Sequence, residues 1–100
     1  MKFEFHPQAL SEYHDAAAYY AARRAGLERE FIYAIEHAID QVLRAPHTWR
    51  IFEDDVRRCL VRVFPYAVLY TIEAGKILIV AVMHSHREPG YWRQRIARTG

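Results

Sequence analysis

The twelve residues from His84 to Arg95 (HSHREPGYWRQR) gather imidazole, guanidinium, phenol and indole groups in one short segment. They directly follow Ile77 to Met83, the longest apolar run of the chain. A buried strand that ends in polar, aromatic and cationic side chains holds them rigidly at one edge of a sheet. We therefore expect the binding surface or the chemistry of this protein at that edge.

His84 and His86 are two residues apart, so an extended backbone places both rings on one face. A zinc site needs three or four ligands, and no third ligand stands at a suitable spacing. We therefore expect no metal site. The sequence also has no Ser-His-Asp order, Gly-rich phosphate loop or paired carboxylates. These patterns argue against a hydrolase or a nucleotide-binding protein, and we expect no cofactor.

The size and composition of the chain favour a small folded protein. Of its 100 residues, 52% are hydrophobic and 14% aromatic, which excludes a disordered chain and predicts a single domain over residues 1–100. Cys59 is the only cysteine, so no disulfide forms within the chain and a reducing cytoplasm is the expected location. The longest apolar run is far short of the roughly 20 residues that cross a bilayer, and no signal core precedes it.

Charge is distributed unevenly along the chain. Residues 1–56 carry a net charge of −4, whereas residues 57–100 carry +6. Such a separation of charge indicates an anionic partner, either a nucleic acid or an acidic protein segment. The alternative is that the charges only balance across a solvated surface.

The first half of the chain predicts one strand and two helices. Phe3 and Phe5 alternate with polar residues, as in a short half-buried strand. Helical periodicity then runs from Gln8 to Ala25, with Gly26 as its C-cap, and again from Leu27 to Ala45. The short joint between them predicts an antiparallel helical hairpin.

The second half predicts three strands after a polar loop around Pro46 to Asp55. The strands are Val56 to Phe64, Tyr66 to Glu73 and Ile77 to Met83. Alternation in the first of them places Cys59, Val61 and Val63 on one face and Arg58, Leu60, Arg62 and Phe64 on the other.

The order of elements predicts an α+β fold. Tyr91 to Arg98 adds an optional short C-terminal helix, so the order is β-α-α-β-β-β with that helix at the end. In this arrangement the helical hairpin packs on one face of a four-stranded, mainly antiparallel sheet.

Local sequences in the strands resemble those of the RelE/ParE superfamily of bacterial toxins from type II toxin–antitoxin modules. The resemblance rests on Val56-Arg57-Arg58, on Phe64 to Tyr70, and on Ile77 to Met83 leading into His84 to Trp92. It covers nearly the whole chain, and the second half carries most of its specificity.

The resemblance implies a toxin that a cognate antitoxin keeps inactive by wrapping it with a flexible segment, in a toxin–antitoxin hetero-oligomer. RelE-like members cleave mRNA at the ribosome, whereas ParE-like members poison DNA gyrase without a recognised catalytic centre of their own. Three hypotheses follow: a ParE-like gyrase poison, a RelE-like mRNA endoribonuclease, or a non-toxic relative that only binds an antitoxin.

If the protein cleaves RNA, its candidate catalytic residues are Arg87, His84 and Tyr91. The guanidinium of Arg87 matches a basic position of the ribonucleases of the family and can meet two phosphate oxygens at once. His84, or alternatively His86, supplies a base or an acid near neutral pH. Tyr91 stacks on a nucleobase or donates a proton.

Two positions depart from the ribonuclease pattern. Where those relatives carry further basic residues, our alignment places Leu60 and Ala67. Part of the charge that mRNA cleavage requires is therefore missing, and the sequence favours ParE-like target binding.

A wider set of basic and aromatic residues is expected to bind the target or the antitoxin. Its members are Arg58, Arg62, His86, Arg87, Tyr91, Trp92 and Arg93. Each also has a structural alternative. The arginines on the strand can be solvated residues that discourage edge pairing, and Trp92 and Tyr91 can pack the C-terminal segment against the sheet. For Trp92 we favour packing.

Overall fold

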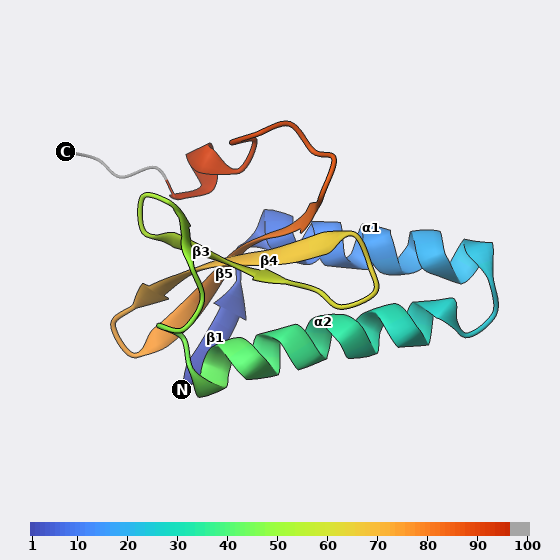
Figure 1. The fold of residues 1–100 in the computed structure, drawn as a ribbon. Helices are drawn as coiled ribbons and strands as arrows, with labels where there is room; N and C mark the ends of the chain where they lie inside the picture. The colour runs from blue at the N-terminus through green and yellow to red at the C-terminus, as the bar shows by residue number, and fades with distance from the viewer. Residues whose placement is uncertain (97–100) are drawn as a thin grey trace.

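A computed structural model of the protein describes residues 1–96 (Figure 1). Its elements are, in chain order, β1 (Lys2–Phe5), α1 (Pro7–Arg23), α2 (Leu27–Arg44), β2 (Ile51–Glu53), β3 (Val56–Leu60), β4 (Tyr66–Glu73), β5 (Lys76–His84) and a 3₁₀ helix (Arg93–Ile96). None of the helices in this part of the chain has the length and apolar character to cross a membrane.

The strands form one mixed sheet in the order β1-β5-β4-β3-β2. Only β1 and β5 run parallel, and every other neighbouring pair is antiparallel. Two helices cover this sheet, which confirms the predicted α+β class and its mainly antiparallel pairing. The sheet has five strands rather than the predicted four.

The additional strand, β2, lies inside the segment that the sequence predicts as a polar loop. Ile51 pairs with Arg57 and Glu53 pairs with Val56, around a turn at Asp54, whose φ is 52°. Because β2 has only three residues, it is too short for an alternating pattern to show in the sequence.

Local signals at both helix ends explain where α1 begins and where α2 follows. The His6 Nδ1 atom accepts a hydrogen bond from the Gln8 backbone N–H at 3.1 Å, and Pro7 fills the first turn. The helix ends at Arg23, two residues before the predicted end. Gly26 has a φ of 87° and stands at the N-cap of α2 rather than at the C-cap of α1.

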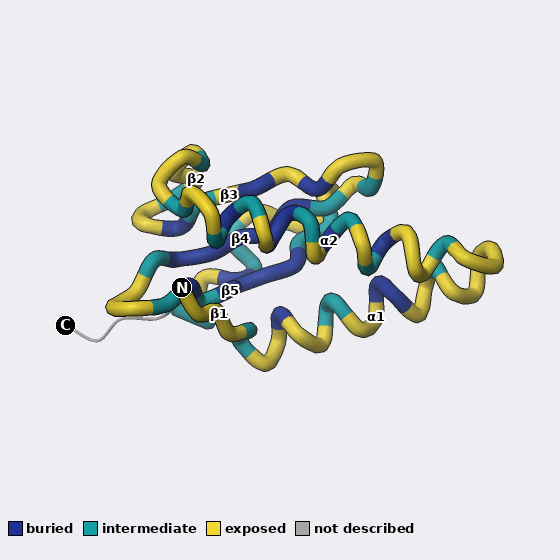
Figure 2. Tube along the Cα trace, turned by 90° about the horizontal axis from the view of Figure 1, so that it is seen from below, coloured by how far each residue is buried: buried dark blue, intermediate teal, exposed yellow. Residues whose placement is uncertain are grey.

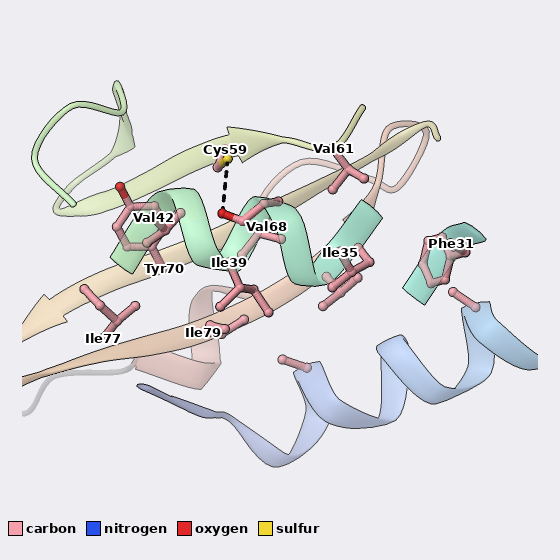
Figure 3. Close-up of a cluster of buried hydrophobic side chains, with 14 of the residues drawn as sticks. Phe31, Ile35, Ile39, Val42, Cys59, Val61, Val68, Tyr70, Ile77 and Ile79 are labelled. Atoms are coloured by element: carbon pink, nitrogen blue, oxygen red, sulfur yellow. Dashed lines mark hydrogen bonds between the residues drawn. The ribbon is translucent and has the colours of Figure 1, made fainter. Parts of the chain in front are cut away.

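The main hydrophobic core lies between the two helices and one face of the sheet (Figures 2 and 3). The predicted apolar face of α2 is buried: Phe31, Ile35, Ala38, Ile39 and Val42. From the sheet, this core receives Cys59, Val61, Val68, Tyr70, Ile77 and Ile79. The core fixes the hairpin against the central strands and so sets where the strand ends emerge.

A second cluster covers the opposite face of the sheet. Trp92 is fully buried there, together with Val56, Ala67, Leu69, Val80 and Ala81. Figure 1 shows the C-terminal segment crossing the sheet on the side away from α2. The sheet is therefore covered on both faces, by helices on one and by the C-terminal segment on the other.

The predicted strand from 56 to 64 ends earlier than expected. β3 stops at Leu60, and Val63 has a φ of 74° and is 94% exposed, so it does not lie on the buried face with Cys59 and Val61. Phe64 packs instead against the main core. The chain turns here so that it can enter β4, and this turn takes Arg62 off the strand face that carries Arg58.

The C-terminal helix is shorter than predicted. It is a single 3₁₀ turn from Arg93 to Ile96, and Tyr91 and Trp92 precede it. Residues 97 and 98 of the predicted helix lie outside the described residues.

Candidate functional site

A cavity of about 320 Å³ lies where α1 meets the paired ends of β4 and β5 and the C-terminal segment. We call it the α1–β5 pocket. Its lining combines carboxylates from α1, aromatic rings, and an imidazole and a guanidinium from the end of β5: Glu12, Asp15, Ala16, Tyr19, Tyr66, Val82, His84, Arg87 and Tyr91. Three residues of the predicted block, His84, Arg87 and Tyr91, thus face one cavity.

The end of β5 forms the tight turn that brings these side chains together. The Arg87 N–H donates to the His84 carbonyl at 3.1 Å, and the Ser85 N–H donates to the Pro65 carbonyl at 2.8 Å. The chain therefore reverses directly after the strand, tied to the loop that enters β4. The turn carries Arg87 back toward α1.

His84 is held in a defined orientation. Its Nδ1 atom accepts the His86 backbone N–H at 3.0 Å, and its ring meets the edge of Tyr66 at a centroid distance of 5.1 Å. In a neutral ring with an accepting Nδ1, the proton sits on Nε2. The free nitrogen of His84 is then a hydrogen-bond donor, which suits binding an acceptor better than removing a proton.

Arg87 lies flat against Tyr91. Its guanidinium carbon is 3.7 Å from the centre of the ring, a close cation–π contact. The side chain stays 43% exposed, and its ion pair at 3.3 Å joins it to the exposed Glu88. Arg87 is thus oriented by a ring and still available to a partner.

The Tyr91 hydroxyl is buried and has no hydrogen-bond partner among the described residues. Burial, and then the nearby Glu12 carboxylate, raise the pKa of this phenol. A raised pKa makes the phenol a weak acid at neutral pH. Tyr91 consequently offers a ring for stacking rather than a proton.

The acidic wall of the pocket comes from α1. Glu12 pairs with Arg95, and Asp15 has no ion-pair partner printed in the described part of the chain and is exposed. An uncompensated carboxylate repels a phosphate chain. The pocket is accordingly of mixed charge and not a basic cradle.

The pocket continues along α1 as a trough. A neighbouring cavity of about 470 Å³ shares Tyr19, Tyr66 and His84 with it and extends to Arg23 and Leu27. A trough of this length, lined by tyrosines, is suited to a segment of a macromolecular partner rather than to a compact small molecule.

The remaining predicted binding residues lie elsewhere. Arg58 stacks over Phe52 at 4.6 Å on the β2–β3 hairpin. Arg93 forms a two-point ion pair with Glu53, in which Nη2 and Oε1 are 2.7 Å apart. Both mark the side of the sheet covered by the C-terminal segment.

Three more predicted residues complete the picture. Arg62 lines a different cavity of about 290 Å³ beside α2. His86 is exposed next to His84, with ring centroids 5.3 Å apart. Trp92 is fully buried, which agrees with packing and leaves no surface for contact with a partner. Among the described residues, no cluster of three metal-ligating side chains is found.

Sequence reasoning missed the contribution of α1 to the site. It assigned Glu12 and Asp15 to a solvated helix face and gave Arg95 no role. The signal was present, because Glu12, Ala16 and Tyr19 follow the three- and four-residue spacing of one helix face. That face meets the end of β5.

The fold and the pocket define a small α+β protein with a helical hairpin on one face of a mainly antiparallel sheet and a mixed-charge trough at the strand ends. A sequence model of the ParE toxins of type II toxin–antitoxin systems, parDE, matches residues 3–89, and the chain belongs to this family. The predicted RelE/ParE membership is thereby confirmed.

The structure is similar to a solved chain described as the chromosomal ParDE toxin–antitoxin system from P. aeruginosa. The TM-score is 0.63 at 14% sequence identity, over 84% of this chain and 95% of that chain. At this identity the likeness shows a shared fold. No curated protein matches the sequence.

Proposed function

We propose that this protein is the growth-inhibiting toxin of a type II module and that it acts by binding DNA gyrase rather than by cutting RNA. The observation that carries the proposal is the composition of the α1–β5 pocket. Arg87 is available there, but the residues around it are not those of a nuclease. Asp15 opposes a polyanion, and the Tyr91 phenol is buried with a raised pKa.

Cleavage of RNA requires a base, an acid and several positive charges close to one phosphate. Arg58, the second basic position of the family pattern, stacks on Phe52 and does not line the pocket. Leu60 is 65% exposed and Ala67 is buried, so neither supplies charge. These placements support binding of a protein target.

The expected partner is a cognate antitoxin, as in the parDE modules of the family. The net charge of +6 on residues 57–100 favours an antitoxin segment that carries acidic and apolar side chains. Toxin and antitoxin then form a hetero-oligomer in which the toxin is inactive.

A supercoiling assay tests the gyrase target. Purified toxin at micromolar concentration should block supercoiling of relaxed plasmid by gyrase and should trap cleaved DNA. Addition of the antitoxin encoded beside the toxin gene should restore supercoiling. If neither inhibition nor cleaved DNA is observed, gyrase is not the target.

One observation favours the second candidate, a ribosome-dependent mRNA endoribonuclease. His84, Arg87 and Tyr91, the three residues that such an enzyme would use, line the same cavity. Mapping of mRNA 5′ ends after toxin induction decides between the two. New ends within translated codons would support the endoribonuclease, and their absence would eliminate it.

A further inference from the structure

β5 extends well beyond the strand that pairs with its outer edge. β1 pairs with β5 from Lys76 to Ile79, and the last backbone contact is the His6 N–H to the Ile79 carbonyl at 2.9 Å. β5 continues to His84. Its outer edge beyond Ile79 therefore lacks a neighbouring strand, and buried backbone groups there need other partners.

Two side chains supply those partners. A Glu12 carboxylate oxygen accepts the Val82 N–H at 3.0 Å, and the Arg95 guanidinium donates to the Val80 carbonyl at 3.0 Å. Glu12 and Arg95 also bond each other at two points, at 3.0 and 2.7 Å. Together they occupy the place along β5 that a longer β1 would have filled.

This pair differs from the other ion pairs of the described residues by its burial. The side chains of Arg95 and Glu12 are 6% and 17% exposed, whereas those of Arg24 and Glu30 are 59% and 58% exposed. Burial of a charge is costly unless it is paired and hydrogen-bonded, as it is here. Removal of one partner leaves the other charge buried.

The same pair fixes the ring on which Arg87 rests. The Arg95 guanidinium is 5.0 Å from the centre of the Tyr91 ring, and the Arg87 guanidinium is 3.7 Å from it. Glu12 lies beside the Tyr91 hydroxyl and also lines the α1–β5 pocket. α1, β5 and the C-terminal segment thus meet at Glu12 and Arg95.

We propose that Glu12 and Arg95 are positioning residues of the α1–β5 pocket: they replace a missing strand with side chains and thereby hold Tyr91 and Arg87 in their binding orientation. The structural part stands on the contacts alone, and the part that concerns target binding rests on the proposed function. Neither residue needs to touch the target.

Nuclear magnetic resonance of the purified toxin tests the structural part. The Arg87 side-chain protons lie over the Tyr91 ring and should show an upfield ring-current shift in the wild type. In Glu12→Gln and Arg95→Gln this shift should be lost. The Val82 amide should exchange faster in Arg95→Gln, by roughly ten- to hundredfold, because its acceptor is no longer held in place.

The matched control is Arg24→Gln, which breaks an exposed ion pair of the same chemistry at the other end of α1. It should leave the Arg87 shift and the Val82 exchange unchanged. If Glu12→Gln and Arg95→Gln also leave both signals unchanged, the inference is wrong. If Arg95→Gln does not fold, Glu12→Gln decides, because its amide oxygen can still accept the Val82 N–H.

The gyrase assay tests the functional part on the same proteins. Glu12→Gln should inhibit supercoiling only at a concentration at least about tenfold higher than the wild type, although circular dichroism shows it folded; this corresponds to one charged hydrogen bond. Arg95→Lys, which keeps the charge without the planar fork, should lie between wild type and Arg95→Gln. Equal inhibition by folded Glu12→Gln and wild type would refute positioning for target binding. If the wild type does not inhibit gyrase, the proposed function fails, and the Arg87 shift still decides the structural part.

Discussion

At the scale of single residues, the pocket depends on how Arg87 is presented. Its guanidinium lies on a ring, is 43% exposed and pairs only with the exposed Glu88 among the described residues. Such a side chain adds little to folding because its charge is already solvated. Its position at the mouth of a cavity is better explained by contact with a partner.

Arg87→Ala should therefore abolish toxicity and leave the fold intact. We expect the free energy of unfolding to change by at most about 0.5 kcal/mol, as for a surface substitution. Growth after induction and urea unfolding of the purified variant are the two measurements. Undiminished toxicity would assign Arg87 to structure alone.

Tyr91→Phe separates stacking from proton transfer. The hydroxyl is buried without a hydrogen-bond partner, so its removal should leave stability unchanged or raise it by up to about 1 kcal/mol. Because the ring remains, a protein that only binds its target should stay toxic. Loss of toxicity in folded Tyr91→Phe would favour a proton donor and hence the endoribonuclease.

At the scale of elements, the helical hairpin is held by an aromatic cluster around Phe31. The ring of Phe31 is fully buried, and its centroid is 5.0 Å from that of Tyr20 and 5.2 Å from those of Phe64 and Tyr66. Both helices and the loop into β4 meet there. The trough along α1 depends on this packing because Tyr66 belongs to both.

Phe31→Ala should destabilise the protein by about 3–5 kcal/mol, through lost burial and the cavity left behind. Tyr33→Ala, two residues further along α2 at a side chain that is 72% exposed, is the control and should change stability by less than about 0.5 kcal/mol. Urea unfolding of both variants measures the difference. Similar losses would mean that the cluster does not hold the hairpin.

Alkaline pH should weaken the core. Burial raises the pKa of the Cys59 thiol to about 11 from a model value of 9.0, and that of the Tyr70 phenol to about 12 from 10.0. The unfolded chain therefore loses these protons first, so stability is complete below pH 9 and falls as the pH rises toward 12. Urea unfolding between pH 7 and 11 measures the decline, and Cys59→Ala should make it shallower. A flat profile up to pH 11 would contradict this.

The limits of prediction from sequence also lie at the level of elements. The helices and β3 to β5 follow from periodicity and from breakers such as Pro46. β2 could not be found, because three residues carry no period. Val63 adopts a left-handed conformation that no local pattern predicts for a β-branched residue.

The pocket shows the same limit more clearly. The block from His84 to Tyr91 was found because its residues are neighbours in sequence. Glu12 was missed because its partner, Arg95, lies 83 residues further along the chain, and only the folded sheet brings them together. A carboxylate on a helix face looks solvated until the opposing segment is known.

At the scale of the whole molecule, charge and fold divide the surface. α2 presents acidic side chains such as Glu36 and Asp40 on its outer face, whereas the strands and the C-terminal segment carry most of the arginines. Arg58, Arg62 and Arg87 are all exposed. An antitoxin that carries acidic and apolar side chains gains most by covering this basic side.

Hydrogen exchange on the purified toxin–antitoxin complex tests that orientation. Amides in residues 57–62 and 84–93 should exchange more slowly in the complex than in free toxin, and those of the outer face of α2 should not change. The rate of dissociation should increase with salt, because exposed charges across an interface are screened beyond a Debye length of about 8 Å at physiological ionic strength. Charge-neutralising Arg58→Gln and Arg62→Gln should reduce this dependence on salt, whereas Arg24→Gln should not. Protection confined to the acidic helices would show that the antitoxin binds the opposite side.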